Sequence, residues 1–435
     1  MKVVSADWVL PVEGDPIEGG AVAIEDGVIT AVGSAAELGA GEHFADAAIV
    51  PGFVNAHTHL EYAVYAGFGD GLSFGPWIAM HVARKSRLGR ADMEAIARLG
   101  AAECLRSGIT TVGDLAFSGA TAHACADLGL RGIVYLEVFG NDADDARRQF
   151  EEKRAYVEPV LSERVRLGVS PHAPYSTSTA VYEYAARLGL PLATHLNESR
   201  DELDWLLHGA GPWQAFGELL VDPLEESGIR SLAAAGLLGP DVVAAHCVEV
   251  DAEEIGLLAR HGVSVTHCPR SNALLGCGIA PLAELRAAGL RVGVGTDGVS
   301  SVPSHDYFEE LRAVISLARA REQRADALSA TEALELATLG GARALGLEAG
   351  IGSLVPGKRA DLAVVSLFGS PYLPWEDPAA AVVYGGSPER ITATLVDGQT
   401  RYERGGTEWH ELIAAASAAR GRMLQHAPAS ATAIS

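Results

Sequence analysis

The sequence predicts an α/β fold, a (β/α)8 TIM-like barrel flanked by a small β-sandwich that is formed from both chain ends. Between residues 52 and 351, eight short apolar runs alternate with segments rich in Ala, Leu, Glu and Arg. Near-continuous apolar strands separated by helices are typical of a parallel sheet buried on both faces, and eight repeats fit a closed barrel better than an open sheet. At both ends of the chain, short apolar runs are instead broken by Asp-Gly and Gly-Gly turns, which are typical of antiparallel strands.

The expected elements follow in chain order. Residues 1–51 contain the runs KVVSADWVLPV, GGAVAIEDGVITAVG and AAIVPG, which we expect to form strands of the sandwich. Residues 52–351 contain the barrel strands GFVNAH, ITTVGDL, RGIVYLEVF, RLGVSPH, LPLATHL, VVAAHCV, GVSVTHC and LRVGVGTD. Residues 352–408 return to strand patterns and complete the sandwich. Residues 409–435 are predicted to form a C-terminal helix and a flexible tail, because APASATAIS has too little apolar surface to fold alone.

Composition limits the class of partner. The chain has 435 residues and a formal net charge of -23, and its 33 basic residues include only four lysines. An acidic surface repels phosphate backbones and anionic lipids, so we expect a small-molecule substrate and neither nucleic acid nor membrane as partner. A homo-oligomer is compatible with the sequence. The five cysteines are scattered without C-x-x-C spacing, and no run of about 18 apolar residues occurs, so we expect reduced thiols and a cytoplasmic protein.

Polar side chains lie where the predicted barrel strands end. They are His57 and His59, His172, His195, His246, His267 and Asp297. The carboxyl ends of barrel strands form the open face on which active sites are built. Because residues i and i+2 of a strand point to the same side, the two imidazoles of HTH are expected to face one pocket. Histidines outside the strands, such as His81, are expected at the surface or in loops, and His305 is kept as a minor candidate.

Three imidazoles and one carboxylate with an open position are the ligands expected of a catalytic Zn²⁺, with Fe²⁺ or Mn²⁺ as substitutes. Such a cation lowers the pKa of its water toward about 7, so the predicted site is hydrolytic.

The motifs PGFVNAHTHL, THLNES, AAHCVEV, THCPRSN and GVGTDG, in this order and with the flanking sandwich, resemble the amidohydrolase superfamily over nearly the whole chain. The resemblance implies that His57, His59, His195 and Asp297 bind the metal. It also implies that His246 hydrogen-bonds the attacking water, that Glu198 is the proton shuttle and that Asp297 holds the second proton.

Members with two metals usually bridge them through a modified lysine at the end of strand four. Here RLGVSPHAPYS contains no lysine, and Lys153, the nearest in sequence, is expected to be a solvated helix residue. The resemblance therefore implies one divalent metal, as in the deaminase and chlorohydrolase branch.

Within that branch, HTHLE, HCPRSN and THLNESRDELDWLLHGAGPW look most like the aminodeoxyfutalosine deaminases of the alternative menaquinone route and related adenosine-type deaminases. The implied reaction converts a 6-aminopurine nucleoside that carries a benzoate into its 6-oxo product and ammonia. The expected substrate contacts are Glu61 to the ribose, Trp77, His172, Arg270 and Ser301. Arg270 has the alternative of fixing its own loop. The cations available for the benzoate are Arg84, Lys85, Arg87 and Arg270, where the segment 84–87 has the alternative of a solvated helix face.

Two positions depart from the adenosine-type pattern. Ser86 stands where relatives often have an acidic residue about nine positions after the tryptophan, and Ala66 stands where many have an arginine. Recognition of the ribose is therefore open at this point. The alternatives are deamination of another heterocycle (an adenosine derivative, guanine, cytosine, a pterin or a triazine), hydrolysis of a cyclic amide, and a metal-binding barrel without catalysis.

Overall fold

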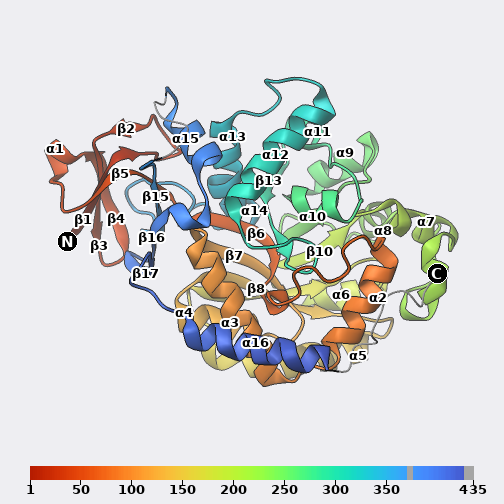
Figure 1. The fold of residues 1–435 in the computed structure, drawn as a ribbon. Coiled ribbons are helices and arrows are strands. Elements are labelled where there is room, and N and C mark those ends of the chain that lie inside the picture. Colours follow the sequence, from red (N-terminus) through yellow and green to blue (C-terminus); the bar gives the residue numbers. More distant parts are fainter. Residues whose placement is uncertain (370–375, 426–435) are drawn as a thin grey trace.

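The computed structural model describes residues 1–369 and 376–425, and its centre is a parallel barrel (Figure 1). The barrel strands are β6 (Phe53–His59), β7 (Ile109–Ala116), β8 (Arg131–Val138), β9 (Val165–Pro171), β10 (Leu192–Leu196), β11 (Val242–His246), β12 (Ser264–His267), β13 (Arg291–Val294) and β14 (Asp297–Gly298). From β6 to β13 each strand pairs with the next in parallel, and β14, which follows β13 along the chain, pairs in parallel with β6 at the other end of the sheet. All eight predicted runs form strands, so the predicted fold class is confirmed.

The eighth strand is interrupted next to the site. β13 ends at Val294, and β14 begins at Asp297, opposite Thr58 of β6. Between them, a Cβ on Gly295 would lie 2.7 Å from the carbonyl oxygen of His57 and 2.8 Å from its Cβ. Only glycine therefore lets the eighth strand pass this close to His57, and the interruption turns Asp297 toward the histidines.

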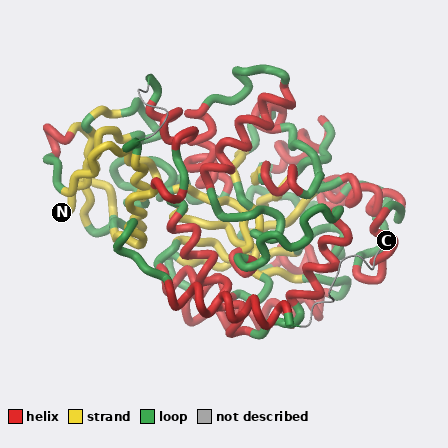
Figure 2. The backbone as a smooth tube through the Cα atoms, in the orientation of Figure 1, coloured by secondary structure: helices red, strands yellow, loops and turns green. Residues whose placement is uncertain are grey.

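Helices surround the strands, as the tube in Figure 2 shows. The α-helices of this layer are α2 (Phe74–Lys85), α3 (Arg90–Arg106), α4 (Ala120–Leu128), α5 (Ala143–Val157), α6 (Thr179–Arg187), α7 (Arg200–His208), α8 (Gly228–Ala234), α9 (Ala252–His261), α10 (Pro269–Leu274), α11 (Leu282–Ala287), α12 (Tyr307–Glu322), α13 (Ala330–Glu335) and α14 (Gly341–Ala344). Shorter turns of helix are η1 (Leu60–Tyr62), η2 (Glu158–Val160), η3 (Pro212–Leu219) and η4 (Leu336–Gly340).

Side-chain parity on the strands separates two apolar layers. Ile133 and Tyr135 of β8 point into the barrel with Leu115 and Ala193, whereas Val134 and Leu136 pack outward against the helices. The barrel interior is thus filled by side chains below the site, as in other closed barrels of this size.

Strands from both chain ends form one mixed sheet of eight strands beside the barrel. They are β1 (Lys2–Val9), β2 (Ile17–Glu18), β3 (Gly20–Glu25), β4 (Val28–Ser34), β5 (Glu42–Pro51), β15 (Leu362–Ser366), β16 (Ile391–Val396) and β17 (Gln399–Glu403), with α1 (Ala35–Leu38), α15 (Pro378–Gly385) and η5 (Pro388–Arg390) in the same two segments. The prediction has a sandwich of these strands. In the structure they are hydrogen-bonded into one continuous sheet, and its residues enclose a second apolar core.

A buried ion-pair network joins this sheet to the barrel. Arg131, the first residue of β8, donates from Nε to Asp361 Oδ2 (2.8 Å) and from Nη2 to Asp397 Oδ1 (2.6 Å). The two aspartates belong to the C-terminal part of the chain, so the network ties the two predicted units together.

The C-terminal helix is α16 (His410–Leu424), which packs along α3 (Figure 1) through Ala416, Ala419 and Met423. The predicted tail, residues 426–435, lies outside the described residues. All five cysteines are buried and have free thiols. In the part of the chain that the structure describes, no helix combines the length and the apolar character that crossing a bilayer requires.

Candidate active site

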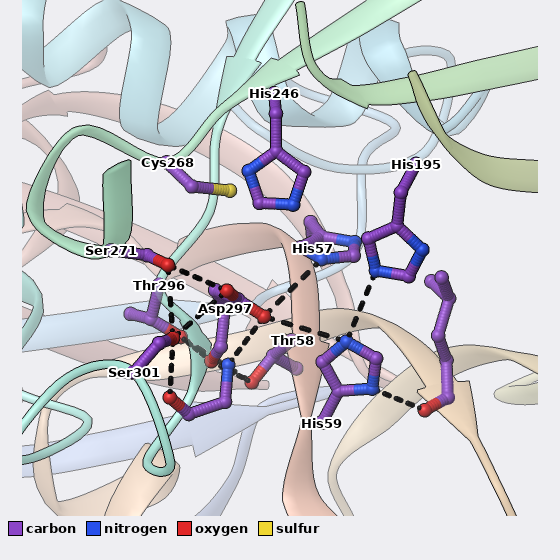
Figure 3. Close-up of polar contacts among 12 residues, drawn as sticks. His57, Thr58, His59, His195, His246, Cys268, Ser271, Thr296, Asp297 and Ser301 are labelled. Carbon is purple, nitrogen blue, oxygen red and sulfur yellow. Dashed lines mark hydrogen bonds and ion pairs between the residues drawn. The ribbon is translucent and has the colours of Figure 1, made fainter. Parts of the chain in front are cut away.

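Residues from three distant strands meet at the carboxyl end of the barrel (Figure 3). His57 and His59 end β6, His195 belongs to β10 and Asp297 begins β14. Asp297 Oδ1 lies 3.5 Å from His57 Nε2 and 3.4 Å from His59 Nε2, and the Nε2 atoms of His59 and His195 are 3.4 Å apart. The structure therefore brings the four predicted metal ligands together.

The imidazoles are held with Nε2 toward the centre of the cluster. His59 Nδ1 donates to the carbonyl oxygen of Leu115, and His195 Nδ1 donates to that of His172, both at 2.8 Å. A hydrogen bond from Nδ1 to a carbonyl fixes the tautomer that leaves Nε2 free to bind a metal. Burial lowers the pKa of His195 to about 4 and the pKa of His59 well below its usual value, so both rings are neutral at neutral pH.

The two oxygens of Asp297 have different partners. Oδ1 faces the histidines and accepts from the backbone N–H of Gly298 (2.7 Å), while Oδ2 accepts from the hydroxyls of Ser271 (2.6 Å) and Ser301 (2.9 Å). Burial by itself would raise the pKa of Asp297, but the facing histidines outweigh it and lower this pKa well below its usual value. Asp297 is thus an ionised carboxylate with one oxygen directed at the cluster.

The donor set fits a divalent metal of the zinc type. Two groups of side chains, His57 with His59 and His195, and His57 with His246 and Asp297, each place their ligand atoms within 4.8 Å of one another. Within residues 1–369 and 376–425, the buried Nε2 atoms of His57 and His246 have no hydrogen-bond partner. Neutral imidazoles and one carboxylate are the ligands that zinc, iron and manganese accept, and a cation would give these nitrogens the partner that they lack.

Glu198 and His246 lie next to this cluster. Glu198 Oε1 is 3.6 Å from His246 Nε2, and both side chains are buried. Burial, with added repulsion from Asp297 and Glu202, raises the pKa of Glu198 well above its usual value. A raised pKa strengthens the hold of a carboxyl group on its proton, which suits a group that accepts a proton and then donates it as a general acid.

The backbone around Glu198 is fixed by Glu202, which the sequence analysis did not single out. Glu202 accepts from the N–H groups of Asn197 (3.1 Å) and Glu198 (2.7 Å), and Ser199 begins α7 as its cap. Glu198 therefore lies in the loop before α7 and not in the first turn of that helix. The segment SRDE, residues 199–202, contains a signal for this arrangement, because Ser followed three residues later by Glu is typical of a helix start.

A pocket opens from the cluster toward α2, β8 and η3. It is lined by His59, Tyr62, Phe74, Trp77, Ile78, His81, Val82, Lys85, Glu137, Phe139, His172, Tyr175, Ser176, His195, Glu198, Leu220, His246, Asp297 and Ser300. Of the predicted substrate contacts, the structure brings Trp77 and His172 to this pocket. Trp77 Nε1 donates to the carbonyl oxygen of Ser300 (3.0 Å), and His172 Nδ1 is 2.7 Å from Ser176 Oγ.

The other three predicted substrate contacts have partners elsewhere. Glu61 accepts from Ser118 N, Ser118 Oγ and Ala120 N, so it holds the β7–α4 loop. Ser301 supports Asp297, as described above. Arg270 pairs with Glu309 (2.9 Å) and Glu310 (3.4 Å) and donates to the carbonyl of Asp306 (2.9 Å), which is the loop-fixing alternative.

Two polar residues, His81 of α2 and Lys153 of α5, differ from their expected places, whereas Lys85 lines the pocket, as the role of a substrate cation requires. His81 and Lys85 lie on α2 and line the pocket, although His81 was expected at the surface. Lys153 of α5 is not a solvated residue: its Nζ donates to the carbonyl of Glu137 (2.6 Å) and lies 5.2 Å from the centre of the Phe117 ring. Arg84 stacks over Phe68 at 3.9 Å and is not among the residues that line the pocket.

Three further residues near the site have no role in the predictions from sequence: Ser271, Asn272 and Glu137. Ser271 and Asn272 belong to HCPRSN. Ser271 supports Asp297, and Asn272 Oδ1 lies 3.3 Å from His246 Nδ1. Glu137 is an acidic residue within an apolar strand, which is itself an unusual pattern and a usable signal.

A (β/α)8 barrel with imidazoles and a carboxylate gathered at the carboxyl ends of its strands defines a hydrolase with a candidate metal site. The model of the amidohydrolase family matches residues 48–401, and the chain belongs to this family.

Individual relatives match nearly the whole chain. A 5-methylthioadenosine/S-adenosylhomocysteine deaminase of Moorella thermoacetica is 35% identical over 414 residues, which cover 91% of this chain and 93% of the relative. A 5'-deoxyadenosine deaminase of Methanothermobacter thermautotrophicus is 31% identical and covers 90% and 91%. The crystal structure of an adenosine deaminase from Xanthomonas campestris with bound zinc superimposes with a TM-score of 0.85 at 29% identity, over 97% and 98% of the two chains. This chain is accordingly an aminohydrolase, an enzyme that acts on a carbon–nitrogen bond.

Proposed function

We propose that the protein is a metal-dependent deaminase of 6-aminopurine nucleosides, with one divalent cation, best Zn²⁺, as cofactor. The single observation that supports this most directly is the cluster of His57, His59, His195 and Asp297 with Glu198 beside it at one end of a pocket. The relatives named above deaminate adenine nucleosides, and one of the solved structures binds zinc.

The pocket walls suit a purine. Trp77, Phe139 and Tyr175 present aromatic surface to the pocket, and the ring centres of Phe139 and His172 are 4.9 Å apart. Flat aromatic side chains offer large apolar contact to a heterocycle, while a few polar groups set its orientation.

The residues have assignable tasks in such a reaction. His57, His59, His195 and Asp297 would hold a divalent cation, which would lower the pKa of a water molecule toward about 7 and so make a nucleophile available at neutral pH. Glu198 accepts a proton from the attacking water and delivers it to a ring nitrogen beside the amino-bearing carbon, which makes that carbon electrophilic. His246 hydrogen-bonds the attacking oxygen. Asp297 takes the second proton and returns it to the leaving ammonia, so that water and the 6-amino compound give the 6-oxo compound and NH₃.

A narrower substrate, aminodeoxyfutalosine, is our first candidate within this class. Its benzoate needs a cation, and Lys85 lines the pocket with its ammonium 3.7 Å from the centre of the Phe117 ring. The relatives act on nucleosides that differ at the 5' position, so this substituent is the variable to test.

The deciding experiment gives zinc-loaded protein a panel of 6-aminopurine nucleosides, with and without a 5'-linked aryl carboxylate, and records ammonia and the ultraviolet shift. We expect deamination throughout the panel and the highest kcat/KM for the aryl carboxylate. Preference for an unmodified nucleoside would remove the narrower candidate. Activity on guanine or cytosine alone would contradict the nucleoside assignment.

A further inference from the structure

Glu137 is a buried acidic residue whose side chain lines the pocket. Its side chain is 1% exposed, and among the residues that the structure describes no donor bonds its Oε2. Leaving a buried acceptor unpaired costs free energy, and in a pocket the missing donor can come from a ligand. The neighbouring acid Glu61 differs, because Ser118 and Ala120 satisfy both of its oxygens.

The strand fixes where this carboxylate points. Ile133 and Tyr135 of β8 point into the barrel, and Glu137 has the same parity at the carboxyl end of the strand, so its side chain emerges at the floor of the pocket. Lys153 Nζ bonds the carbonyl oxygen of Glu137 at 2.6 Å and holds the strand end from outside. A group placed on a rigid strand is positioned more precisely than one on a loop.

Two lysines near the Glu137 carboxylate act against the effect of its burial. Lys85 and Lys153 favour its ionised form, although burial is the larger effect and raises the pKa of Glu137 to about 7. Lys85 is 9% exposed, and its Nζ lies 3.4 Å from the Tyr62 hydroxyl. The floor of the pocket thus offers an acceptor that matches neutral donors such as hydroxyl groups.

We propose that Glu137 is the residue that binds the sugar hydroxyls of the substrate, so that a vicinal diol is a requirement for efficient turnover. This inference rests on the proposed nucleoside deaminase function. In this proposal Glu137 of β8 accepts the hydrogen bonds of the sugar hydroxyls, so an acidic residue at position 86, after α2, is not needed for this contact. Both regions line the same pocket, since Lys85 ends α2 directly before Ser86.

The test compares adenosine with 2',3'-dideoxyadenosine in zinc-loaded parent, Glu137→Gln and the control Glu152→Gln, which changes an exposed acid of α5. The parent and the control are expected to turn over the dideoxy compound with kcat/KM lower by about 100-fold or more, because two hydrogen bonds to a charged group are lost and the carboxylate stays unpaired. In Glu137→Gln, the preference for the diol is expected to collapse to about threefold, through loss on adenosine alone. Undiminished preference in this variant overturns the proposal, and circular dichroism at the assay temperature checks that the variant is folded.

Failure of the proposed function gives a different result. If the parent deaminates neither compound, nucleoside deamination is refuted, and calorimetric binding of the same two ligands to the same three proteins then decides the role of Glu137. Binding that prefers the diol in the parent and loses this preference in Glu137→Gln supports the proposal. Equal binding of both ligands, or none, overturns it.

Discussion

Two serines that bond Asp297 provide the sharpest test of the candidate metal site. Ser271 and Ser301 place their hydroxyls 2.6 and 2.9 Å from Oδ2, so Oδ1 is left to face the histidines. A hydrogen bond to a charged group contributes about 1.5–3 kcal/mol, and a change of about 1.4 kcal/mol corresponds to a factor of ten. Loss of such a support around a metal ligand typically lowers metal affinity about 10-fold to 100-fold. We therefore expect Ser271→Ala to weaken Zn²⁺ binding within that range.

The assay titrates Zn²⁺ into metal-free protein in competition with a chromogenic chelator at fixed pH. The two hydroxyls lie 2.9 Å apart, so the losses in Ser271→Ala and Ser301→Ala are not expected to add fully in the double variant. Ser34→Ala, whose hydroxyl bonds Glu37 on the exposed surface, is the control and should bind like the parent. A double variant whose affinity stays within about twofold of the parent's, with an unchanged fold, would refute the view that Asp297 is a ligand oriented by these serines.

Three further predictions concern the proton shuttle, the pocket cation and the buried acid. Glu198→Gln is expected to keep Zn²⁺ affinity within about threefold and to lose about 100-fold to 10,000-fold in kcat, which is the range of general acid and base catalysis. A near-normal rate of ammonia release in stopped assays would contradict the assignment of Glu198 as the proton shuttle. Lys85→Met is expected to lower kcat/KM by about 10-fold or more for nucleosides with a 5'-linked aryl carboxylate and to change kcat/KM for adenosine little, with both substrates assayed side by side. Equal losses of kcat/KM on the two substrates would count against a contact between Lys85 and the carboxylate. The pKa of Glu137 is raised to about 7 by burial, in the presence of the facing Glu61, Lys85, Lys153 and Asp297, so the folded state holds this proton more tightly than the unfolded chain does. The stabilising contribution of the protonated form is therefore complete below about pH 4.5 and is lost as the pH rises through about 7. The free energy of unfolding should fall by no more than about 1.36 kcal/mol per pH unit in this window. Urea unfolding of the parent and Glu137→Gln across this range should show the difference in slope, and parallel curves would contradict the raised pKa.

The strand framework could be predicted from the sequence because apolar runs between helical segments are a strong signal. The same signal placed the metal ligands, since strand ends in a closed barrel must meet on one face. The strand patterns at the two chain ends also predict one shared β-sandwich, and in the structure hydrogen bonding between β1 and β5 and between β5 and β15 joins these strands into one continuous sheet.

The side chain of Glu61 points away from its predicted direction for a local reason. Extending the alternation of His57 and His59 by two residues assumes that the strand continues, but η1 begins at Leu60. Once the backbone leaves the extended conformation, side-chain parity no longer applies, and Glu61 turns toward Ser118. Parity is reliable only within a strand, and the sequence HTHLEY contains no glycine or proline to mark its end.

The places predicted for His81 and Lys153 differ from the structure because the orientation of a helix cannot be read from its own composition. Phe74, Trp77, Ile78, His81 and Lys85 lie at helical spacing and form one face of α2, and this face covers the pocket and not the outside of the barrel. Lys153 reaches inward because its long aliphatic stem runs along aromatic rings and delivers the ammonium to the end of β8.

The predicted metal ligands lie on barrel strands, whereas residues of α2 line the pocket in which a substrate would bind. His246 and Asp297 have φ values of 75° and 63°, which cost roughly 1–3 kcal/mol each for residues other than glycine, and such strain is kept where the surrounding strands enforce it. Asp297, a predicted metal ligand, is therefore held in place by the strands around it. The face of α2 lines the pocket and bears no predicted metal ligand, so replacing residues 74–85 should change which nucleosides are accepted while zinc affinity stays within about threefold. Loss of zinc binding in a folded protein with such a replacement would mean that α2 and the strand ends are not separable.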